Sequence, residues 1–228
     1  MITIALSKGR ILKQTLPLLD KVGIRLLDDP FTSRKLIFAT NEDNIQAVVL
    51  RATDVPTYVQ FGAADLGIVG KDGLLEHGGE GLNELLDLKI SKCRLMTAVR
   101  DTDKDTPRTD KRLRVATKYV KSARAFYQAQ GVQAQIIKLY GAMELAPLVG
   151  LADEIVDLVE TGNTLAANNL VAKDLVANIS CRLIANAASM RTQYELISGF
   201  VEALQQQVNL ETWSYRERWY QTLAVQFW

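Results

Sequence analysis

Residues 156–165, Val-Asp-Leu-Val-Glu-Thr-Gly-Asn-Thr-Leu, hold the chemically most informative pattern of this sequence. An apolar run typical of a buried strand leads into Thr161-Gly162-Asn163-Thr164, and a helical pattern follows. Exposed backbone N–H groups, two hydroxyls and a helix start favour the binding of a phosphate dianion. Gly162 can adopt positive φ and lets the backbone come close to a ligand. The pattern predicts an anion-binding loop; a strand–turn–helix with threonine caps is the alternative.

Two carboxylates accompany this loop and suit a sugar ligand. Asp157 lies within the apolar run, and Glu160 stands directly before Thr161. Carboxylate oxygens there can accept hydrogen bonds from neighbouring ribose hydroxyls. The two carboxylates are therefore candidate partners of a ribose beside the bound phosphate. The candidate residues of the whole segment are Asp157, Glu160, Thr161, Gly162, Asn163, Thr164 and Leu165.

Cations recur beside other predicted strands, where they can bind further phosphates. Lys8-Gly9-Arg10 follows the apolar run 2–6 and begins a helix, so two cations and backbone donors converge there. Arg34 and Lys35 precede a strand, and Arg51 ends one. Arginine suits this role because its planar fork grips phosphate oxygens in a bidentate manner. Taken one at a time, each basic residue is more often a solvated side chain.

Three further positions have two interpretations each. Lys71 and Asp72 follow a buried strand in Gly-Lys-Asp-Gly, where they either contact a ligand or begin a helix that Asp72 stabilises. Glu144 lies in the first turn of a predicted helix, where a carboxylate often only stabilises the helix.

Short apolar runs alternate with helical patterns along the chain, which is typical of a mostly parallel α/β sheet. Strands are predicted at 2–6, 36–39, 47–50, 66–69, 84–90, 94–99, 113–116, 136–139, 155–159 and 177–184. Helices are predicted at 11–22, 54–62, 120–130, 143–151 and 187–207. Ligands of open α/β sheets bind beyond the carboxyl ends of strands, so the loops described above lie where a site is expected.

A charged run at residues 101–112 interrupts this alternation. It predicts a solvated segment that leads into a second lobe. The fold class is therefore α/β, with two lobes separated by a cleft, each a mixed, mostly parallel sheet flanked by helices. The predicted domains are 1–99 with 178–208, an inserted lobe at 100–177, and a helical C-terminal tail at 209–228.

Composition excludes several classes of protein. Lys and Arg number 27 against 26 Asp and Glu, and a net charge of +1 gives no overall field for nucleic acid. No apolar stretch is long enough to cross a bilayer, and cations follow the first apolar run, the reverse of a secretory signal. We expect a cytoplasmic protein with no nucleic acid or membrane partner. The single histidine, His77, fits a helix end, so a His-based triad or metal site is not expected.

The anion-binding loop resembles the phosphoribosyl-pyrophosphate loop of phosphoribosyltransferases. Its form, Asp-Leu-Val-x-Thr-Gly-x-Thr-Leu, is similar to that of ATP phosphoribosyltransferases. Other segments agree with that family in the same order: 5–10, 33–36, 51–59, 62–72 and 138–147. The resemblance covers roughly residues 1–205.

This resemblance implies transfer of the phosphoribosyl group of phosphoribosyl pyrophosphate to N1 of ATP, the first step of histidine biosynthesis. It implies Mg²⁺ on the pyrophosphate, held mainly by substrate oxygens, so no protein ligand is assigned. Arg10 and Arg34 are the expected catalytic residues, and the loop set above is expected to bind phosphoribosyl pyrophosphate. The residues expected at ATP are Lys8, Gly9, Arg51, Lys71, Asp72 and Glu144.

The resemblance is to the short form of the family, because few residues follow the predicted helix 187–207. It implies a homodimer within a hetero-oligomer that includes a regulatory subunit related to histidyl-tRNA synthetase. In the tail, Trp213, Tyr220, Leu223 and Phe227 can line one helical face. That face either packs on its own chain or anchors an interface.

Two other functions fit parts of the pattern. The predicted architecture is that of a two-lobed, periplasmic-binding-protein-like fold, which also suits a sensor of a small anion. The loop led by Asp157 argues against a generic solute, and the order of the first residues argues against a periplasmic receptor. A phosphoribosyltransferase for a free base or small acid is the third possibility. The several basic segments favour a polyphosphate co-substrate instead.

Overall fold

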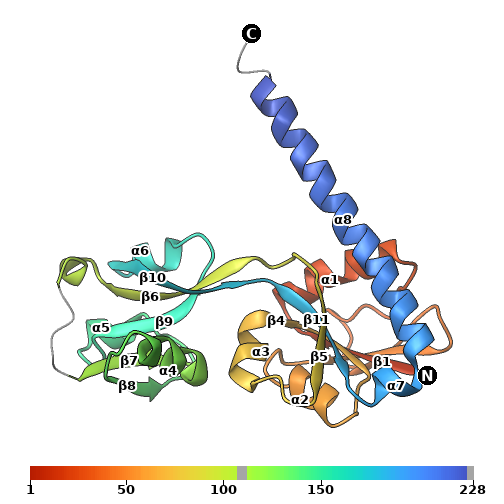
Figure 1. Ribbon diagram of the computed structural model, residues 1–228, viewed down its shortest axis with the longest axis horizontal. Helices are drawn as coiled ribbons and strands as arrows, with labels where there is room; N and C mark the ends of the chain where they lie inside the picture. Colours follow the sequence, from red (N-terminus) through yellow and green to blue (C-terminus); the bar gives the residue numbers. More distant parts are fainter. Residues whose placement is uncertain (107–111, 225–228) are drawn as a thin grey trace. The chain divides into compact units, whose positions relative to one another are not determined.

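In the computed structural model, the chain forms two α/β units, each built on its own sheet (Figure 1). The structure describes residues 1–106 and 112–224, with side chains to residue 210. The first unit comprises Met1–Gly73, Gly79–Ser91 and Ser180–Trp228, and the second comprises Leu74–Gly78 and Lys92–Ile179. The sequence prediction assigns residues 74–78 and 92–99 to the first lobe, but both ranges lie in the second unit. Glu76 and His77 accept hydrogen bonds from Lys121 there, and β6 (Cys93–Arg100) pairs with two strands of that unit.

The first unit is built on a six-stranded sheet with the order β2-β3-β1-β4-β11-β5. The strands are β1 (Ile2–Ser7), β2 (Ile37–Ala39), β3 (Ile45–Leu50), β4 (Leu66–Gly70), β5 (Leu82–Asp87) and β11 (Cys181–Asn186). β1 pairs in parallel with β3 and β4, whereas β2 runs antiparallel to β3 and β11 antiparallel to both β4 and β5. β1, β3, β4 and β5 therefore point the same way.

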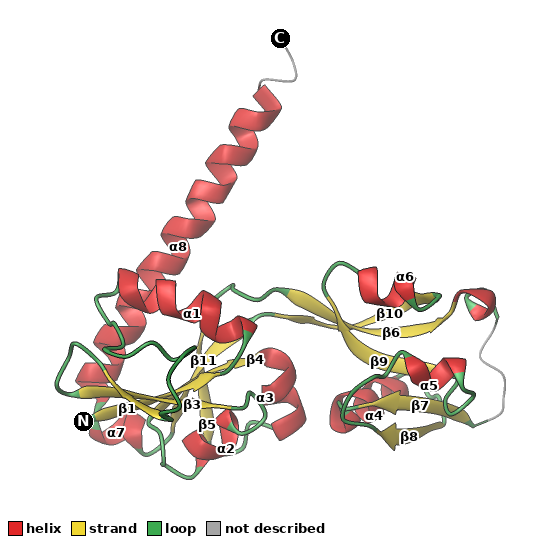
Figure 2. Ribbon diagram, turned by 180° about the vertical axis from the view of Figure 1, so that it is seen from behind, coloured by secondary structure: helices red, strands yellow, loops and turns green. Residues whose placement is uncertain are grey.

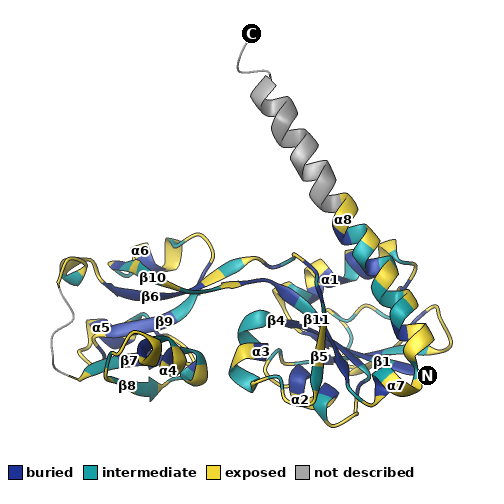
Figure 3. Cartoon of the chain, in the orientation of Figure 1, coloured by how far each residue is buried: buried dark blue, intermediate teal, exposed yellow. Residues whose placement is uncertain are grey.

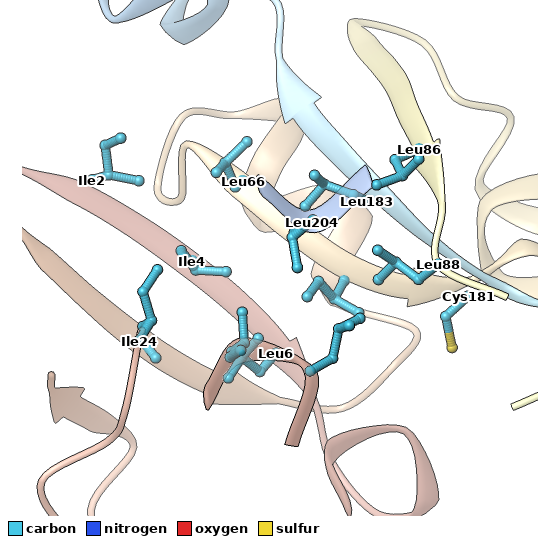
Figure 4. Packing of buried hydrophobic residues seen from close by; sticks show 14 of the residues in the cluster. Ile2, Ile4, Leu6, Ile24, Leu66, Leu86, Leu88, Cys181, Leu183 and Leu204 are labelled. Atoms are coloured by element: carbon cyan, nitrogen blue, oxygen red, sulfur yellow. The ribbon is translucent and has the colours of Figure 1, made fainter. Parts of the chain in front are cut away.

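Apolar side chains on one face of this sheet form the larger core. That face is covered by α1 (Arg10–Lys21) and by α8 (Tyr194–Ala224), which contact each other. Leu6 and Leu183 from the sheet are fully buried there beside Leu204 of α8 (Figure 4). Both helices present apolar residues at spacings of three and four, which places them on one helical face.

The opposite face carries α2 (Val55–Gln60), and Gly67 of β4 is the reason that this helix can lie so close. A Cβ on Gly67 would stand 2.7 Å from Cγ2 of Val59 and 2.9 Å from Cγ1 of Val55. A side chain at Gly67 would therefore push α2 away from the sheet.

Asp65, just before β4, holds the amino end of the sheet together. Its carboxylate accepts hydrogen bonds from the Thr3 backbone N–H (2.8 Å), Ser189 Oγ (2.6 Å) and Gln193 Nε2 (3.0 Å). Ser189 belongs to the short helix α7 (Ser189–Thr192), which precedes α8. Asp65 and Gly67, both in the family-like segment 62–72, thus serve packing and hydrogen bonding within the first unit.

The second unit is built on a five-stranded sheet with the order β10-β6-β9-β7-β8 (Figure 2). Beside β6, its strands are β7 (Leu113–Thr117), β8 (Ala134–Lys138), β9 (Glu154–Val159) and β10 (Leu170–Ile179). β7 is parallel to β8 and β9, and β6 is antiparallel to β9 and β10. A 3-10 turn, Asp101–Asp103, follows β6 within the charged run, of which residues 107–111 lie outside the described part.

Two apolar clusters cover the two faces of this second sheet. On one face, Ala123 and Tyr127 of α4 (Val120–Ala129) pack with Val115 and Val156. On the other face, side chains of α5 (Leu145–Leu148), of α6 (Asn163–Ala167) and of the segments beside them pack on the strands. They include Met143, Ala146, Ile155, Val159 and Leu165. In both units the buried residues concentrate in the strands (Figure 3).

Three predicted elements differ from the structure. The strand predicted at 177–184 is two strands, because β10 pairs with β6 whereas β11 pairs with β4 and β5. The helix predicted at 143–151 is confined to Leu145–Leu148, since Gly150, with a φ of 72°, follows closely. The helix predicted at 187–207 is α7 followed by α8, which continues to Ala224 through most of the predicted tail.

The aromatic face predicted for the tail lies outside the described side chains, which end at residue 210. His77 ends α3 (Lys71–His77), and Gly78 follows with a φ of 102°, as expected for a helix end. Within residues 1–106 and 112–224, no helix combines the length and apolarity that a membrane span requires.

A buried carboxylate in the second unit gives a test of its core. Glu154 is 3% exposed and accepts a hydrogen bond of 2.7 Å from the hydroxyl of Tyr127, itself 1% exposed. Replacing Tyr127 with Phe removes this donor from a buried acceptor and should lower the free energy of unfolding by about 1.5–3 kcal/mol. Urea denaturation measures the change. Tyr140→Phe, at a position that is 87% exposed, is the control and should leave stability unchanged; equal effects of the two variants would contradict the assignment.

Candidate functional site

Parallel pairing in the first unit brings the carboxyl ends of β1, β3 and β4 to one edge of the sheet. Ser7 is in register with Leu50, and Leu6 with Ile68. Two hydrogen bonds fasten these ends: the Lys8 N–H donates to the Leu50 carbonyl and Ser7 Oγ to the Ile68 carbonyl, both at 2.8 Å. Since β2 is antiparallel to β3 and β11 is antiparallel to β4, the first residues of β2 and β11 lie at this same edge.

This edge, called here the first carboxyl edge, gathers every basic segment singled out in the sequence. Lys8, Gly9 and Arg10 follow β1, and Gly9 is the N-cap of α1 with a φ of 83°. Arg51 follows β3, Lys71 and Asp72 follow β4, and Arg34 precedes β2. The side chains of Lys8, Arg10, Arg34 and Arg51 are exposed. The edge therefore offers four solvent-exposed cations beside backbone donors.

Lys71 is less exposed than these four cations and forms an ion pair. Its ammonium lies 2.5 Å from Glu84 of β5, and Glu84 also pairs with Arg182 of β11 at 2.8 Å. The Lys71 backbone N–H donates to the Ser180 carbonyl at 2.9 Å. The structure thus places Lys71 and Asp72 at the first carboxyl edge, as the first residues of α3, with the Lys71 charge balanced by Glu84.

The second unit has an equivalent edge, called here the second carboxyl edge, where β7, β8 and β9 end. Thr117 of β7 is in register with Val156 of β9 and with Lys138 of β8. Thr117 Oγ1 donates to the Val156 carbonyl at 2.6 Å, which fixes the end of β7 against β9. The segment carrying Glu144 follows β8, and the anion-binding loop follows β9. Parallel pairing therefore places both at this edge.

The loop has the backbone that the sequence predicts. Gly162 is the N-cap of α6 in the left-handed region, with φ 84° and ψ −2°. Thr161, Asn163 and Thr164 are exposed, and Thr161 Oγ1 accepts a hydrogen bond of 3.4 Å from the Asn163 N–H. The first N–H groups of a helix have no acceptor inside it, so this turn presents donors outward from the strand end.

The other predicted loop residues fall into two groups. Leu165 is 6% exposed and packs with Met143 and Val159, so only its backbone can contact a ligand. Asp157 is half-buried on the same side of β9 as Val159, and its Oδ1 accepts the Leu158 N–H at 2.8 Å. Glu160 is exposed.

Lys118 is a residue that the sequence interpretation left out. It directly follows β7 at the second carboxyl edge, is exposed, and its ammonium lies 4.8 Å from the centre of the Tyr119 ring. The hydroxyl of Thr117 accepts the Tyr119 N–H at 2.9 Å, which holds this turn in place. The only available signal was its position after a strand, because a single lysine carries no motif.

Comparisons with known proteins agree on one family. The family model for ATP phosphoribosyltransferase (HisG) matches residues 51–206. An ATP phosphoribosyltransferase of Alcanivorax borkumensis is 60% identical over 203 residues, which cover 89% of this chain and 94% of the relative. One from Hahella chejuensis is 58% identical over 211 residues, 92% of this chain and 99% of the relative.

The chain belongs to the ATP phosphoribosyltransferase family. It is thus a transferase of the first step of histidine biosynthesis, as the motifs predicted. Family membership decides against the anion sensor and against a phosphoribosyltransferase for a free base.

Solved structures support the same family and the predicted fold. The ATP phosphoribosyl transferase (HisG:HisZ) complex from Thermotoga maritima matches with a TM-score of 0.79 and 32% identity, covering 92% of this chain and 99% of that chain. The periplasmic sulphonate-binding protein SsuA of Escherichia coli matches with a TM-score of 0.58 at 16% identity, over 95% of this chain and 75% of that chain. The second likeness concerns the fold alone and confirms its periplasmic-binding-protein-like class.

Gly162 allows backbone strain to be separated from ligand binding. An added Cβ would meet only Val159 Cγ1 at 4.0 Å, so Gly162→Ala costs left-handed strain without a clash. Gly131 has a φ of 68° and no atom within 4 Å of an added Cβ, which makes Gly131→Ala a matched control. Both variants should lose about 1–2 kcal/mol of stability.

If the loop binds phosphate as the sequence predicts, only Gly162→Ala should also raise the KM for phosphoribosyl pyrophosphate, by about tenfold, because the shifted N–H groups lose hydrogen bonds to it. Steady-state kinetics at saturating ATP measure this. The same KM in Gly162→Ala and Gly131→Ala would remove the loop from the substrate site.

Proposed function

We propose that the second carboxyl edge binds the phosphoribosyl part of phosphoribosyl pyrophosphate. In this proposal Thr161, Gly162, Asn163, Thr164 and the Leu165 N–H hold the 5-phosphate, and Asp157 and Glu160 orient the ribose hydroxyls. The supporting observation is the left-handed turn at Gly162, which aims exposed donors beyond the strand end. The loop itself brings only negative charge, so a cation must come from elsewhere; Lys118 is the cation that we assign there.

The exposed cations of the first carboxyl edge suit the pyrophosphate and the phosphates of ATP. Arg10 and Arg34 are assigned to the leaving pyrophosphate, and Lys8, Gly9 and Arg51 to ATP. Lys71 and Asp72 are weaker candidates because Glu84 already balances the Lys71 charge. Glu144, which follows β8 in the second unit, is assigned to ATP.

The reaction that these residues serve is a displacement at a sugar carbon. N1 of adenine attacks C1 of phosphoribosyl pyrophosphate with inversion, the C1–O bond breaks, and pyrophosphate leaves with the electron pair. Positive charge develops on the sugar while negative charge grows on pyrophosphate. No covalent enzyme nucleophile is needed, so the residues act by positioning the substrates and by stabilising the charge on the leaving group.

A magnesium ion bound to pyrophosphate is part of the proposal. When bound, it supplies Lewis-acid chemistry to the leaving group. Among the described residues, no group of three or more His, Cys, Asp or Glu side chains could hold a metal. Asp157 and Glu160, which precede the loop, fit an ion that keeps most of its ligands as water and substrate oxygens.

We further propose that the chain is a short-form catalytic subunit in the cytoplasm. It would form a homodimer and assemble with a regulatory subunit related to histidyl-tRNA synthetase. This is supported by the Thermotoga structure, a HisG:HisZ complex that this chain matches over 92% of its length.

Turnover is tested with purified chain, ATP, phosphoribosyl pyrophosphate and magnesium, following phosphoribosyl-ATP by its ultraviolet absorbance. Inorganic pyrophosphatase removes the by-product. Product that requires both substrates is the expected result. Lack of product, also after a HisZ-like subunit is added, together with no binding of phosphoribosyl pyrophosphate, would contradict the proposal.

The two arginines assigned to the leaving group give a sharper prediction. Arg10→Ala and Arg34→Ala should each lower kcat by about 100-fold, the size of effect seen when one donor to a developing oxyanion is lost. Arg25→Ala, an exposed arginine paired with Asp20 in the same unit, is the control and should keep the kcat of the unmodified chain. A kcat that stays within about twofold in Arg10→Ala or Arg34→Ala would remove that residue from the leaving-group role.

A further inference from the structure

The longer of the two stretches that belong to the second unit, Lys92–Ile179, is joined to the first unit by two segments that share one anchor. The first crossover, residues 88–92, leads from β5 to β6. The second crossover, residues 179–181, consists of the last residue of β10, Ser180 and the first residue of β11. Their backbones are paired: the Leu88 N–H donates to the Cys181 carbonyl at 2.9 Å and the Cys181 N–H to the Ile90 carbonyl at 3.0 Å. Backbone hydrogen bonds therefore join the two crossovers to each other beside the first unit.

Asp87, the last residue of β5, binds both crossovers. Its Oδ1 accepts the Lys89 N–H of the first crossover at 2.9 Å and the Ser180 hydroxyl of the second at 2.8 Å. Its Oδ2 pairs with Arg182 of β11, whose side chain is 15% exposed and also pairs with Glu84. Partial burial raises the pKa of Asp87, but the bonds from Arg182, Lys89 and Ser180 outweigh it and hold the pKa below its usual value.

The first crossover adopts a conformation that needs such support. Lys89 and Ser91 have φ values of 56° and 50°, in the left-handed region that non-glycine residues rarely occupy. Ser91 is held by Gln14 of α1, whose Oε1 accepts both its N–H (2.6 Å) and its hydroxyl (2.8 Å). Lys89 is held by Asp87. Each strained residue is thus bound by one side chain of the first unit.

We propose that Asp87 is a positioning residue of the transfer reaction, which fixes both crossovers in one conformation. It acts through Lys89, Ser180 and Arg182, none of which we assign to a substrate. Asp87 ends β5 at the first carboxyl edge, and its partner Arg182 also pairs with Glu84, so losing Asp87 should loosen both crossovers and lower turnover. Its effect on kinetics rests on the proposed function, whereas its effect on the crossovers does not.

Hydrogen exchange of the full chain without substrates tests the structural half. Asp87→Ala should speed amide exchange at Leu88, Lys89 and Cys181 by at least about tenfold, and Asp87→Asn, which keeps a side-chain acceptor, by less. The matched control is Asp153→Ala. Asp153 also has a lowered pKa, through its hydrogen bonds with Arg114 (2.7 Å), and should affect exchange only near Arg114. Unchanged exchange at the crossovers, or equal acceleration throughout the first unit, would overturn the proposal.

Kinetics test the catalytic half. Asp87→Ala should lower kcat about tenfold while the KM for each substrate stays within about twofold, and Asp87→Asn should recover part of the loss. Faster exchange with an unchanged kcat would reduce Asp87 to a structural residue and reject the positioning role. If the unmodified chain shows no transferase activity, the proposed function fails, and the exchange experiment still decides whether Asp87 holds the crossovers.

Discussion

Parallel strand pairing is the constraint on which the candidate sites depend. In each unit it brings the ends of three strands to one edge, and a side-chain hydroxyl fastens that edge: Ser7 in the first unit and Thr117 in the second. Residues that are 40 or more positions apart in sequence, such as Arg10 and Arg51, thereby reach the same edge. The chemistry of each edge then follows from which residues come directly after the strands.

The two edges have opposite characters, and the proposed reaction uses that difference. The first gathers exposed cations, which suit pyrophosphate and nucleotide phosphates. The second carries a left-handed turn with hydroxyls and backbone donors beside two carboxylates, which suits a phosphorylated ribose. The apolar core beside each edge lies within the same unit as that edge. Packing inside the unit therefore fixes the geometry of the edge.

Sequence patterns predicted the strands that precede the candidate site residues, because buried strands are short, apolar and followed by turn residues. Gly162 and Gly9 were found for the same reason, since a glycine after a strand is a strong local signal. The division between β10 and β11 was missed because an apolar run does not reveal which sheet each half joins. The pairing of Lys71 with Glu84, and the anchoring role of Asp87, depend on long-range register between β4, β11 and β5 that no local pattern encodes.

The central claim, that the turn at Gly162 receives the 5-phosphate through its backbone, is tested most directly by amide-resolved NMR during a titration with phosphoribosyl pyrophosphate. The account predicts saturable shifts at the N–H groups of residues 161–165, with smaller changes at the carboxyl edge of β7 and none at Gly131, which also has a positive φ. Saturable binding that leaves the amides of residues 161–165 unchanged would contradict it.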